Sequence, residues 1–294
     1  MAYLLKNKNI ELLLELPLEE YNLARFDWTG KIREVKYKGR YLSTQEFADA
    51  SPAQHCGRGF YNEFGITQAV GFDEIQQGEH FQKIGIGTLQ KNNNAYQFHH
   101  PYPIQAATFE CKTSADRVSI FCQPKATNGY SYELYKEIQL LESGFEVGYK
   151  LINTGEKPIL TKEYNHNFLA IDRSSIGPDY TLAFAFPVQS DLFQQTVNPE
   201  EAVEFTQGKI CFQSQPQNPF FFSDLSGGQE VEAFWKLENL TSKLGISETG
   251  SFKTKAINLW GWGHVISPEL FIDVKIPAGT SQQWTRTYQI YELD

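Results

Sequence analysis

A histidine flanked by two asparagines lies in the middle of an apolar stretch, KEYNHNFLAID, at residues 162–172. Strand interiors favour β-branched and aromatic residues, and a buried polar side chain is costly unless it finds a hydrogen-bond partner. Because side chains alternate between the faces of a strand, His166 shares a face with Tyr164 and Phe168. His166 is therefore a candidate for acid–base chemistry, and a satisfied core histidine is the simpler interpretation.

A carboxylate occurs near the end of a second unusual stretch, LWGWGHVISPELF, at residues 259–271. Trp260, Trp262 and His264 share one face of this predicted strand, whereas two glycines occupy the other. Glycines on one face allow another group to approach closely, or they mark a bulge. Indole rings fill cores, and they also pack against the apolar faces of sugar rings. Partial burial of Glu269 would raise its pKa towards the range of a general base.

Three glycines surround an arginine in HCGRGFYNEFG, at residues 55–65. They permit tight backbone geometry at Arg58, close in sequence to Asn62 and Glu63. The segment lacks a Gly-Lys-Ser/Thr ending and a following helix, which excludes a phosphate-binding P-loop. An ordinary loop with a solvated arginine and a ligand-binding segment both remain open.

Histidines and cysteines give no metal-binding pattern. His99 and His100 are adjacent, and neighbouring strand residues point to opposite faces, so at most one of them can serve a common pocket. The four cysteines have neither CxxC spacing nor companion histidines at zinc-finger spacing. We therefore expect free thiols, no metal and no cofactor. The cysteines are Cys56, Cys111, Cys122 and Cys211.

The composition suits a large core built from strands. Of 294 residues, 41% are hydrophobic, and they include 22 Phe, 15 Tyr and 5 Trp. A net charge of −9 without a basic run argues against binding to nucleic acid or to an anionic membrane. No apolar run of about 18 residues and no signal-peptide pattern occurs, so we expect a soluble cytoplasmic protein.

Alternation with a period of two residues dominates the chain. In YSYELYKEIQL, residues 130–140, the apolar side chains share one face with Lys136 as the exception, and the alternation resumes after a turn at ESG. Short helical turns are predicted only at STQEFADA (43–50) and NPEEAVEFT (198–206). We predict one all-β domain over residues 1–294, a large antiparallel β-sandwich, because two stacked sheets are needed to bury so many aromatic rings.

These segments resemble the galactose mutarotase-like superfamily, which includes the aldose 1-epimerases, and the resemblance covers the whole chain. NHNFLAID (165–172) resembles that family's Asn-His-x-Tyr-Phe-Asn-Leu strand, which would make His166 the general acid. The closing segment PELFIDVKIPAGTSQQWTRTYQIY (268–291) is similar to the family's final strands, which would make Glu269 the base. GRGFYNEFG (57–65) is similar to its Gly-Arg-x-x-Asn segment, which would make Arg58 a ligand of sugar hydroxyls.

The resemblance implies a super-sandwich of antiparallel sheets with a sugar site on a concave face. It also implies interconversion of sugar anomers without a cofactor. A base removes the proton of the C1 hydroxyl while an acid protonates the ring oxygen; the ring opens, the aldehyde rotates, and the ring closes on its other face. Beyond Arg58, the candidate substrate-binding residues are Asn62, Lys83, His99 and Trp262, with Trp260 as the alternative aromatic surface.

The sequence departs from the family in two places. Asn62 lies one residue further from Arg58 than the family pattern has it. The family's His-Gly-Gly segment is absent, and GFDEIQQGEHFQKIGIG (71–87) stands in its place. His80, Lys83 and Asp73 are the candidates to substitute for the missing histidine.

The departures leave the substrate open, and two other functions are compatible with the sequence. A non-catalytic carbohydrate-binding protein would use the same cleft and aromatic rings without a working acid–base pair. A hexose-phosphate epimerase would need several cations around the phosphate, and Arg58, Arg40 and Lys83 are the candidates. The sugar, its anomeric preference and the oligomeric state are left undetermined.

Overall fold

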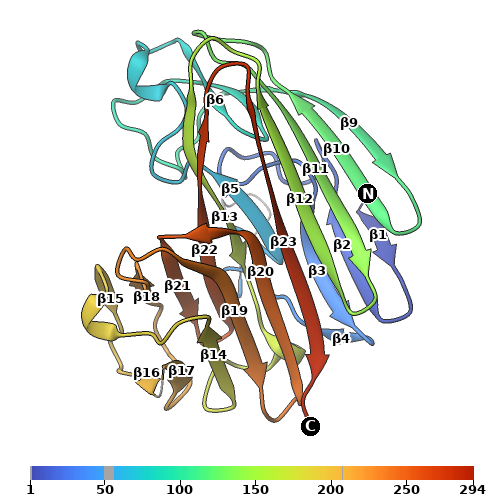
Figure 1. Cartoon of the computed structure of the whole chain (residues 1–294), viewed down its shortest axis with the longest axis vertical. Helices are drawn as coiled ribbons and strands as arrows, with labels where there is room; N and C mark the ends of the chain where they lie inside the picture. The colour runs from blue at the N-terminus through green and yellow to red at the C-terminus, as the bar shows by residue number, and fades with distance from the viewer. Residues whose placement is uncertain (1, 50–55, 207) are drawn as a thin grey trace.

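The computed structural model describes residues 2–49, 56–206 and 208–294, and it consists almost entirely of strands (Figure 1). The all-β prediction is confirmed. None of the described helices is long and apolar enough to cross a bilayer. The strands are β1 (Tyr3–Lys6), β2 (Ile10–Glu15), β3 (Lys31–Tyr37), β4 (Arg40–Tyr41), β5 (Phe60–Phe64), β6 (His80–Lys83), β7 (Gly87–Gln90), β8 (Ile104–Ala106), β9 (Thr108–Thr113), β10 (Arg117–Gln123), β11 (Tyr132–Leu141), β12 (Gly144–Asn153), β13 (Ile159–Asn167), β14 (Tyr180–Phe184), β15 (Gln195–Val197), β16 (Val203–Thr206), β17 (Lys209–Phe212), β18 (Phe220–Ser223), β19 (Val231–Asn239), β20 (Leu244–Thr254), β21 (Ile257–Trp262), β22 (Val265–Ile276) and β23 (Ser281–Glu292). Three short 3₁₀ helices are η1 (Phe72–Glu74), η2 (Ile171–Arg173) and η3 (Ser190–Leu192).

Two ten-stranded sheets form the two layers of the fold. The first sheet has the order β1-β2-β3-β5-β13-β22-β21-β18-β15, with β4 paired to β3. The second has the order β16-β17-β14-β19-β20-β23-β12-β11-β10-β9, and it crosses in front of the first in Figure 1. Strands β6, β7 and β8 form a small third sheet. This is the large antiparallel sandwich that the period-two alternation predicts.

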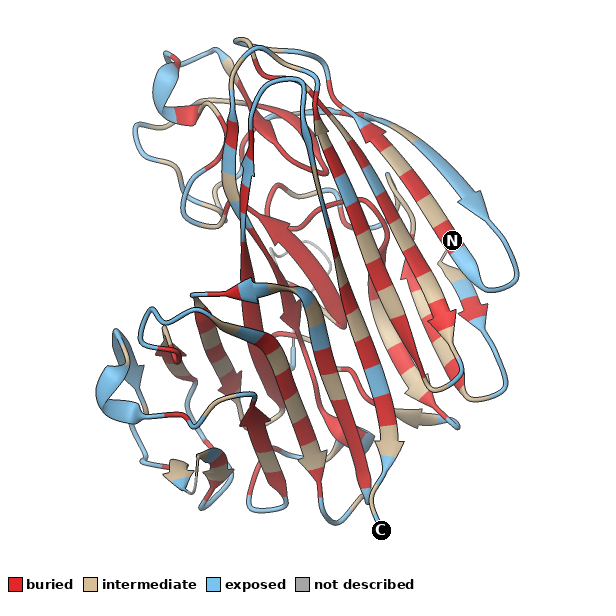
Figure 2. Ribbon diagram, in the orientation of Figure 1, coloured by how far each residue is buried: buried red, intermediate tan, exposed pale blue. Residues whose placement is uncertain are grey.

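The core fills the space between the two large sheets. Buried and less buried residues alternate along the strands of the second sheet, which gives the banding in Figure 2. The predicted hairpin is present, because β11 and β12 pair antiparallel across the turn at 142–143. Lys136, the exception in the apolar pattern, is buried as well. Its Nζ donates to Asn62 Oδ1 at 2.8 Å and lies 3.4 Å from Asp27, so its charge has a partner in the core.

A buried ionic network ties the two sheets together. Arg286 on β23 lies between Glu163 on β13 and Glu248 on β20, with nitrogen–oxygen distances of 2.6 Å to each carboxylate. All three side chains are fully buried. Each carboxylate also accepts a hydrogen bond from an indole N–H group: Trp284 donates to Glu163, and Trp235 donates to Glu248. The charges are thereby paired and hydrogen-bonded, as burial requires.

The two asparagines beside His166 belong to this core. Asn165 donates to the hydroxyl of Tyr288 at 2.6 Å, and Asn167 donates to Glu248 at 3.0 Å and to the carbonyl of Pro268 at 2.7 Å. Alternation along β13 therefore sends both carboxamides towards the second sheet. The side chain of His166 points to the opposite face of the first sheet.

Neither short helical turn is present in the described residues. Val203–Thr206, the end of NPEEAVEFT, forms β16 and pairs with β17, because burial of Val203 in the core outweighs the local preference for a turn of helix. Residues 43–49 form turns and isolated bridges instead. Ala50, the last residue of STQEFADA, lies outside the described residues, and so does His55 of the glycine-rich segment.

The four free cysteines differ in accessibility, which leads to a first prediction. Cys111 on β9 is exposed, Cys122 on β10 is buried, and Cys56 and Cys211 are intermediate. A thiol reagent added to the folded protein without reductant should label Cys111 first and leave Cys122 unlabelled until the protein unfolds. Timed alkylation with peptide mapping measures this order. Early labelling of Cys122, or fewer than four reactive thiols after denaturation, would contradict it.

Candidate active site

Strands β13 and β22 bring His166 and Glu269 face to face. The ladder between these strands and the isolated bridge from Leu169 to Ile266 keep one register, and in that register His166 stands opposite Glu269. Directly opposed residues on antiparallel strands have their side chains on the same face and within contact. His166 Nε2 and Glu269 Oε1 are 3.2 Å apart.

The pair borders a cavity of about 1010 Å³ with a largely aromatic wall. The two side chains are only 5% and 6% exposed, so they meet the cavity with their reactive atoms while their bodies are packed. The aromatic lining residues are Phe47, Phe98, Tyr164, Phe221, Trp260 and Trp262. The polar lining residues beside the pair include Arg25, Glu46, His99, Asn258 and His264.

Ser267 and Phe168 fix the orientation of the His166 ring. The hydroxyl of Ser267 lies 2.7 Å from Nδ1 and 3.5 Å from Glu269 Oε1. It also accepts a hydrogen bond from the backbone N–H of Asn167 at 3.0 Å. The ring of Phe168 stacks on the imidazole with centroids 3.9 Å apart. These contacts leave Nε2 facing Glu269, the geometry that a proton-transfer pair requires.

Burial moves the two pKa values in directions that suit a shared proton. It lowers the pKa of His166 well below its usual value, and the nearby Arg25 charge adds to this effect. Burial raises the pKa of Glu269 to about 8, with Arg25 opposing the shift and Glu63 and Glu46 adding to it. Between these two values the pair as a whole holds one proton. An imidazolium beside a carboxylate also holds one proton. The proton can therefore move from Glu269 to His166 along their contact without changing the charge of the pair.

Arg25 is the arginine among the described lining residues of the cavity, and no motif in the sequence indicated it. Its Nη1 lies 2.8 Å from Glu46, and its Nε lies 3.5 Å from Glu63. Its guanidinium also lies over the rings of Phe26 and Phe98, at 4.4 and 5.0 Å from their centroids. The only signal in the sequence was an arginine beside aromatic residues in RFDWTG.

Two of the predicted binding residues, His99 and Trp262, line the cavity. Trp262 donates its indole N–H to the carbonyl of Gln217 at 2.8 Å, which fixes one edge of the ring. Gly261 lies between Trp260 and Trp262 and lets the ring of Phe220 approach the strand from its other face. A Cβ on Gly261 would lie 2.4 Å from the ring of Phe220, so close approach explains the glycine there.

Asn62 and Lys83 do not line this cavity. Asn62 donates to Glu163 at 3.0 Å and accepts from Lys136, so it belongs to the core between the sheets. Lys83 is 2% exposed, donates to the hydroxyl of Tyr96 at 2.8 Å and lies 3.6 Å from Glu63. Neither residue therefore borders the candidate site, and a role as substrate ligand stays a prediction for both.

Arg58 also lies away from the cavity and borders a neighbouring one. The reason is the alternation around it. The adjacent Gly57 faces Phe168, since a Cβ there would lie 2.2 Å from that ring, and Arg58 turns the other way. In the cavity the cation is Arg25. Of the candidates for the family's missing histidine, His80, Lys83 and Asp73 are all absent from the described lining, whereas His99 and His264 belong to it.

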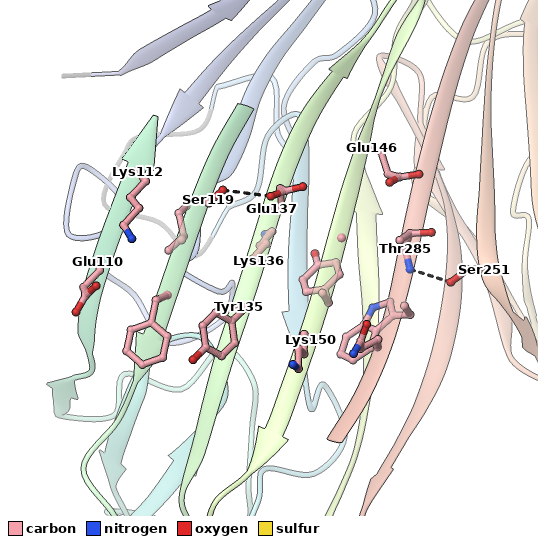
Figure 3. Close-up of a pocket in the computed structure, with 16 residues that line it drawn as sticks. Glu110, Lys112, Ser119, Tyr135, Lys136, Glu137, Glu146, Lys150, Ser251 and Thr285 are labelled. Atoms are coloured by element: carbon pink, nitrogen blue, oxygen red, sulfur yellow. Dashed lines mark hydrogen bonds between the residues drawn. The ribbon is translucent and has the colours of Figure 1, made fainter. Parts of the chain in front are cut away.

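A different cavity, of about 760 Å³, lies on the second sheet (Figure 3). Its described lining holds no histidine, and it contains both glutamates and lysines. Glu137, for example, accepts from Ser119 and pairs with an exposed Arg117. The cavity at His166 and Glu269 is the better candidate for chemistry.

Comparison with known proteins agrees with the architecture. Neither models of known families nor curated sequences match the chain. Solved structures do: an Escherichia coli K12 protein provisionally described as an aldose 1-epimerase superposes with a TM-score of 0.65 at 10% identity, covering 100% of this chain and 99% of that one. A galactose mutarotase-like protein from Lactobacillus casei ATCC 334 gives 0.60 at 12%, covering 99% and 100%.

A galactose mutarotase related enzyme from Lactobacillus acidophilus is similar as well, with a TM-score of 0.59 at 10% identity and complete coverage of both chains. Identities this low carry information about the fold and not about the reaction. They confirm the fold that the sequence resemblance implied. The chain has the β-sandwich fold of the galactose mutarotase-like proteins.

Proposed function

We propose that this protein is a carbohydrate-active isomerase of the aldose 1-epimerase kind, which interconverts the anomers of a sugar. The observation that carries the proposal is the contact of 3.2 Å between His166 and Glu269 in an aromatic-walled cavity. The names of the structural neighbours support the same reaction class. Titratable side chains with strongly shifted pKa values at the border of a cavity are typical of functional sites.

The reaction needs two proton transfers on one sugar molecule. In our proposal the C1 hydroxyl and the ring oxygen replace the direct contact between the two side chains. Glu269 removes the proton of the C1 hydroxyl, and His166 protonates the ring oxygen as the C1–O bond breaks. After rotation of the aldehyde the two transfers reverse and the ring closes. Each catalytic group contributes about 10²- to 10⁴-fold.

Binding would rest on the residues around the pair. The indoles of Trp260 and Trp262 offer flat faces to the apolar side of a pyranose ring. Arg25 and His99 offer donors to its hydroxyls. Arg25 therefore takes the role that the sequence resemblance gave to Arg58.

The direct test is mutarotation of freshly dissolved anomers, followed by polarimetry or NMR across a panel of sugars. The wild-type protein should exceed the spontaneous rate for at least one sugar. Binding of that sugar, measured by calorimetry, serves as the control for a folded site. A protein that binds a sugar and never exceeds the spontaneous rate at any pH would be a carbohydrate-binding protein instead.

The shifted pKa values predict an unusual pH profile. The active pair holds one proton, so kcat/KM should fall as pH rises through about 8, where Glu269 loses that proton in the free protein. On the acid side it should fall only below the lowered pKa of His166, where the pair takes up a second proton. Initial rates between pH 4 and 10 measure both limbs. A rate already halved at pH 6.5, the usual histidine pKa, would contradict the assignment.

A further inference from the structure

A third cavity, of about 460 Å³, adjoins the cavity at His166 and Glu269. Ala48 and His264 line both of these cavities. Its lining contains three arginines that come from separate parts of the chain: Arg33 on β3, Arg58 before β5, and Arg173 in η2. The protein as a whole carries a net charge of −9. A concentration of cations at one cavity of an acidic protein therefore calls for a specific cause.

The guanidinium groups of Arg58 and Arg173 have N–H donors that a ligand could use. Within the described parts of the chain, no group accepts a hydrogen bond from the guanidinium of Arg58 or of Arg173. Arg173 stacks on the ring of Tyr41 with its central carbon 3.5 Å from the ring centroid. Stacking occupies the face of a guanidinium and leaves the N–H groups at its edge available.

The charges around the cavity are only partly compensated, because Arg58 and Arg173 have no ion pair among the described residues. Among the described residues of the lining, the glutamate is Glu34, which pairs with Lys36 at 2.9 Å. Arg33 pairs through Nη1 with Glu20 at 2.9 Å, while its Nε is buried without a hydrogen-bond partner among the described residues. A buried donor of this kind is costly unless a ligand or water satisfies it.

Arg40, in contrast, uses its guanidinium in contacts within the protein. It pairs with Asp172 at 3.0 Å and donates to the carbonyl of Ser242 at 2.7 Å, and it does not belong to the lining. Of the three candidate phosphate ligands in the sequence, Arg40 and the buried Lys83 are therefore already engaged. Arg58 alone lines the cavity, together with Arg33 and Arg173, which the sequence analysis did not single out.

We propose that Arg33, Arg58 and Arg173 form an anion pocket that holds the phosphate or carboxylate group of a sugar whose ring occupies the adjacent cavity. The planar fork of an arginine matches both oxyanions, and such charge-assisted bonds are among the strongest in proteins. This inference rests on the proposed function, which it deepens. The substrate class is then an acidic sugar, either a sugar phosphate or a sugar acid, and a neutral hexose is a poor substrate.

The test compares hexose 6-phosphates, hexuronic acids and the matching free hexoses by NMR exchange between anomers. Arg58→Gln and Arg173→Gln should each raise KM for the preferred anionic sugar by about 10- to 100-fold, the range of a lost hydrogen bond to a charged group, with kcat within a few-fold. Their rates on neutral hexoses should not change. Arg40→Gln, the matched control outside the pocket, should behave as wild type. A preference for the phosphate or for the uronate arm identifies the anion.

Calorimetry separates failure of this proposal from failure of the proposed function. Inorganic phosphate and hexose 6-phosphate should bind the wild-type protein, and both variants should weaken that binding while Arg40→Gln does not. If no sugar is isomerised and this pattern of binding still holds, the isomerase proposal is wrong and the anion pocket stands. Equal losses for neutral and anionic sugars, or phosphate binding that neither variant weakens, would overturn the anion pocket.

Discussion

Replacing Glu269 by glutamine is expected to slow mutarotation of the preferred sugar by about 10²-fold or more, and His166→Gln should do the same. Each substitution keeps the size and part of the hydrogen bonding of the side chain and removes its capacity to transfer a proton. The loss falls on the transition state, so binding of the sugar should stay within a few-fold of wild type. Polarimetry at substrate saturation and calorimetry measure the two quantities.

A matched control is His100→Gln. His100 is an imidazole outside the cavity whose Nε2 lies 2.9 Å from Asn92, and its replacement should leave the rate unchanged. The double substitution of His166 and Glu269 should cost little more than either single one, because two groups that act as one unit are not additive. Variants that keep wild-type rates, or that lose binding as strongly as rate, would refute the acid–base assignment.

The second large effect concerns the core between the sheets. Replacing Arg286 by methionine should lower the free energy of unfolding by at least about 3–5 kcal/mol, because it leaves the buried carboxylates of Glu163 and Glu248 without their cation. Urea denaturation followed by tryptophan fluorescence measures the loss. Arg117→Met, which breaks an exposed pair with Glu137 on the same sheet, is the control and should cost less than about 1 kcal/mol.

The Arg286→Met variant should also respond to pH in a characteristic direction. Burial raises the pKa of Glu248 and the charge of Arg286 opposes that shift, so loss of the arginine raises the folded-state pKa of Glu248 further above its unfolded value. The folded state then binds more protons than the unfolded state, so the variant should regain stability as pH falls. Adding Glu163→Gln and Glu248→Gln should restore part of the loss at pH 7. A loss below about 1 kcal/mol for Arg286→Met alone would show that the network contributes little.

Alternation with a period of two residues was the reliable pattern in the sequence. Alternation with period two follows from the geometry of a strand, so it predicted the all-β sandwich and the hairpin of β11 and β12. It also predicted that His166 and its two flanking asparagines lie on opposite faces. The local pattern at 198–206 was misleading, because pairing of β16 with β17 overrides a weak helical preference.

Asn62 and Arg58 lie outside the cavity lining for one physical reason. A family motif specifies spacing along the chain, whereas the face that a residue presents follows from strand alternation. In the register of β5 and β13, His166 pairs with Tyr61, so Tyr61 and Glu63 share its face and Asn62 lies on the other. Alternation along β5 favours Glu63 over Asn62 as the residue on the face of His166. In the structure Glu63 contacts Tyr164 and Arg25.

The sequence alone thus determined the strand-rich architecture, which follows from local spacing, and it made His166 and Glu269 the candidates for proton transfer. Only the tertiary structure decided that His166 and Glu269 touch, because their contact depends on the pairing of strands far apart in the chain. It also decided that Arg25 serves the cavity and that Arg58 joins Arg33 and Arg173 in the next one. The shifted pKa values of His166 and Glu269 likewise depend on the tertiary structure, because their burial comes from the packing of the whole fold and from no single segment.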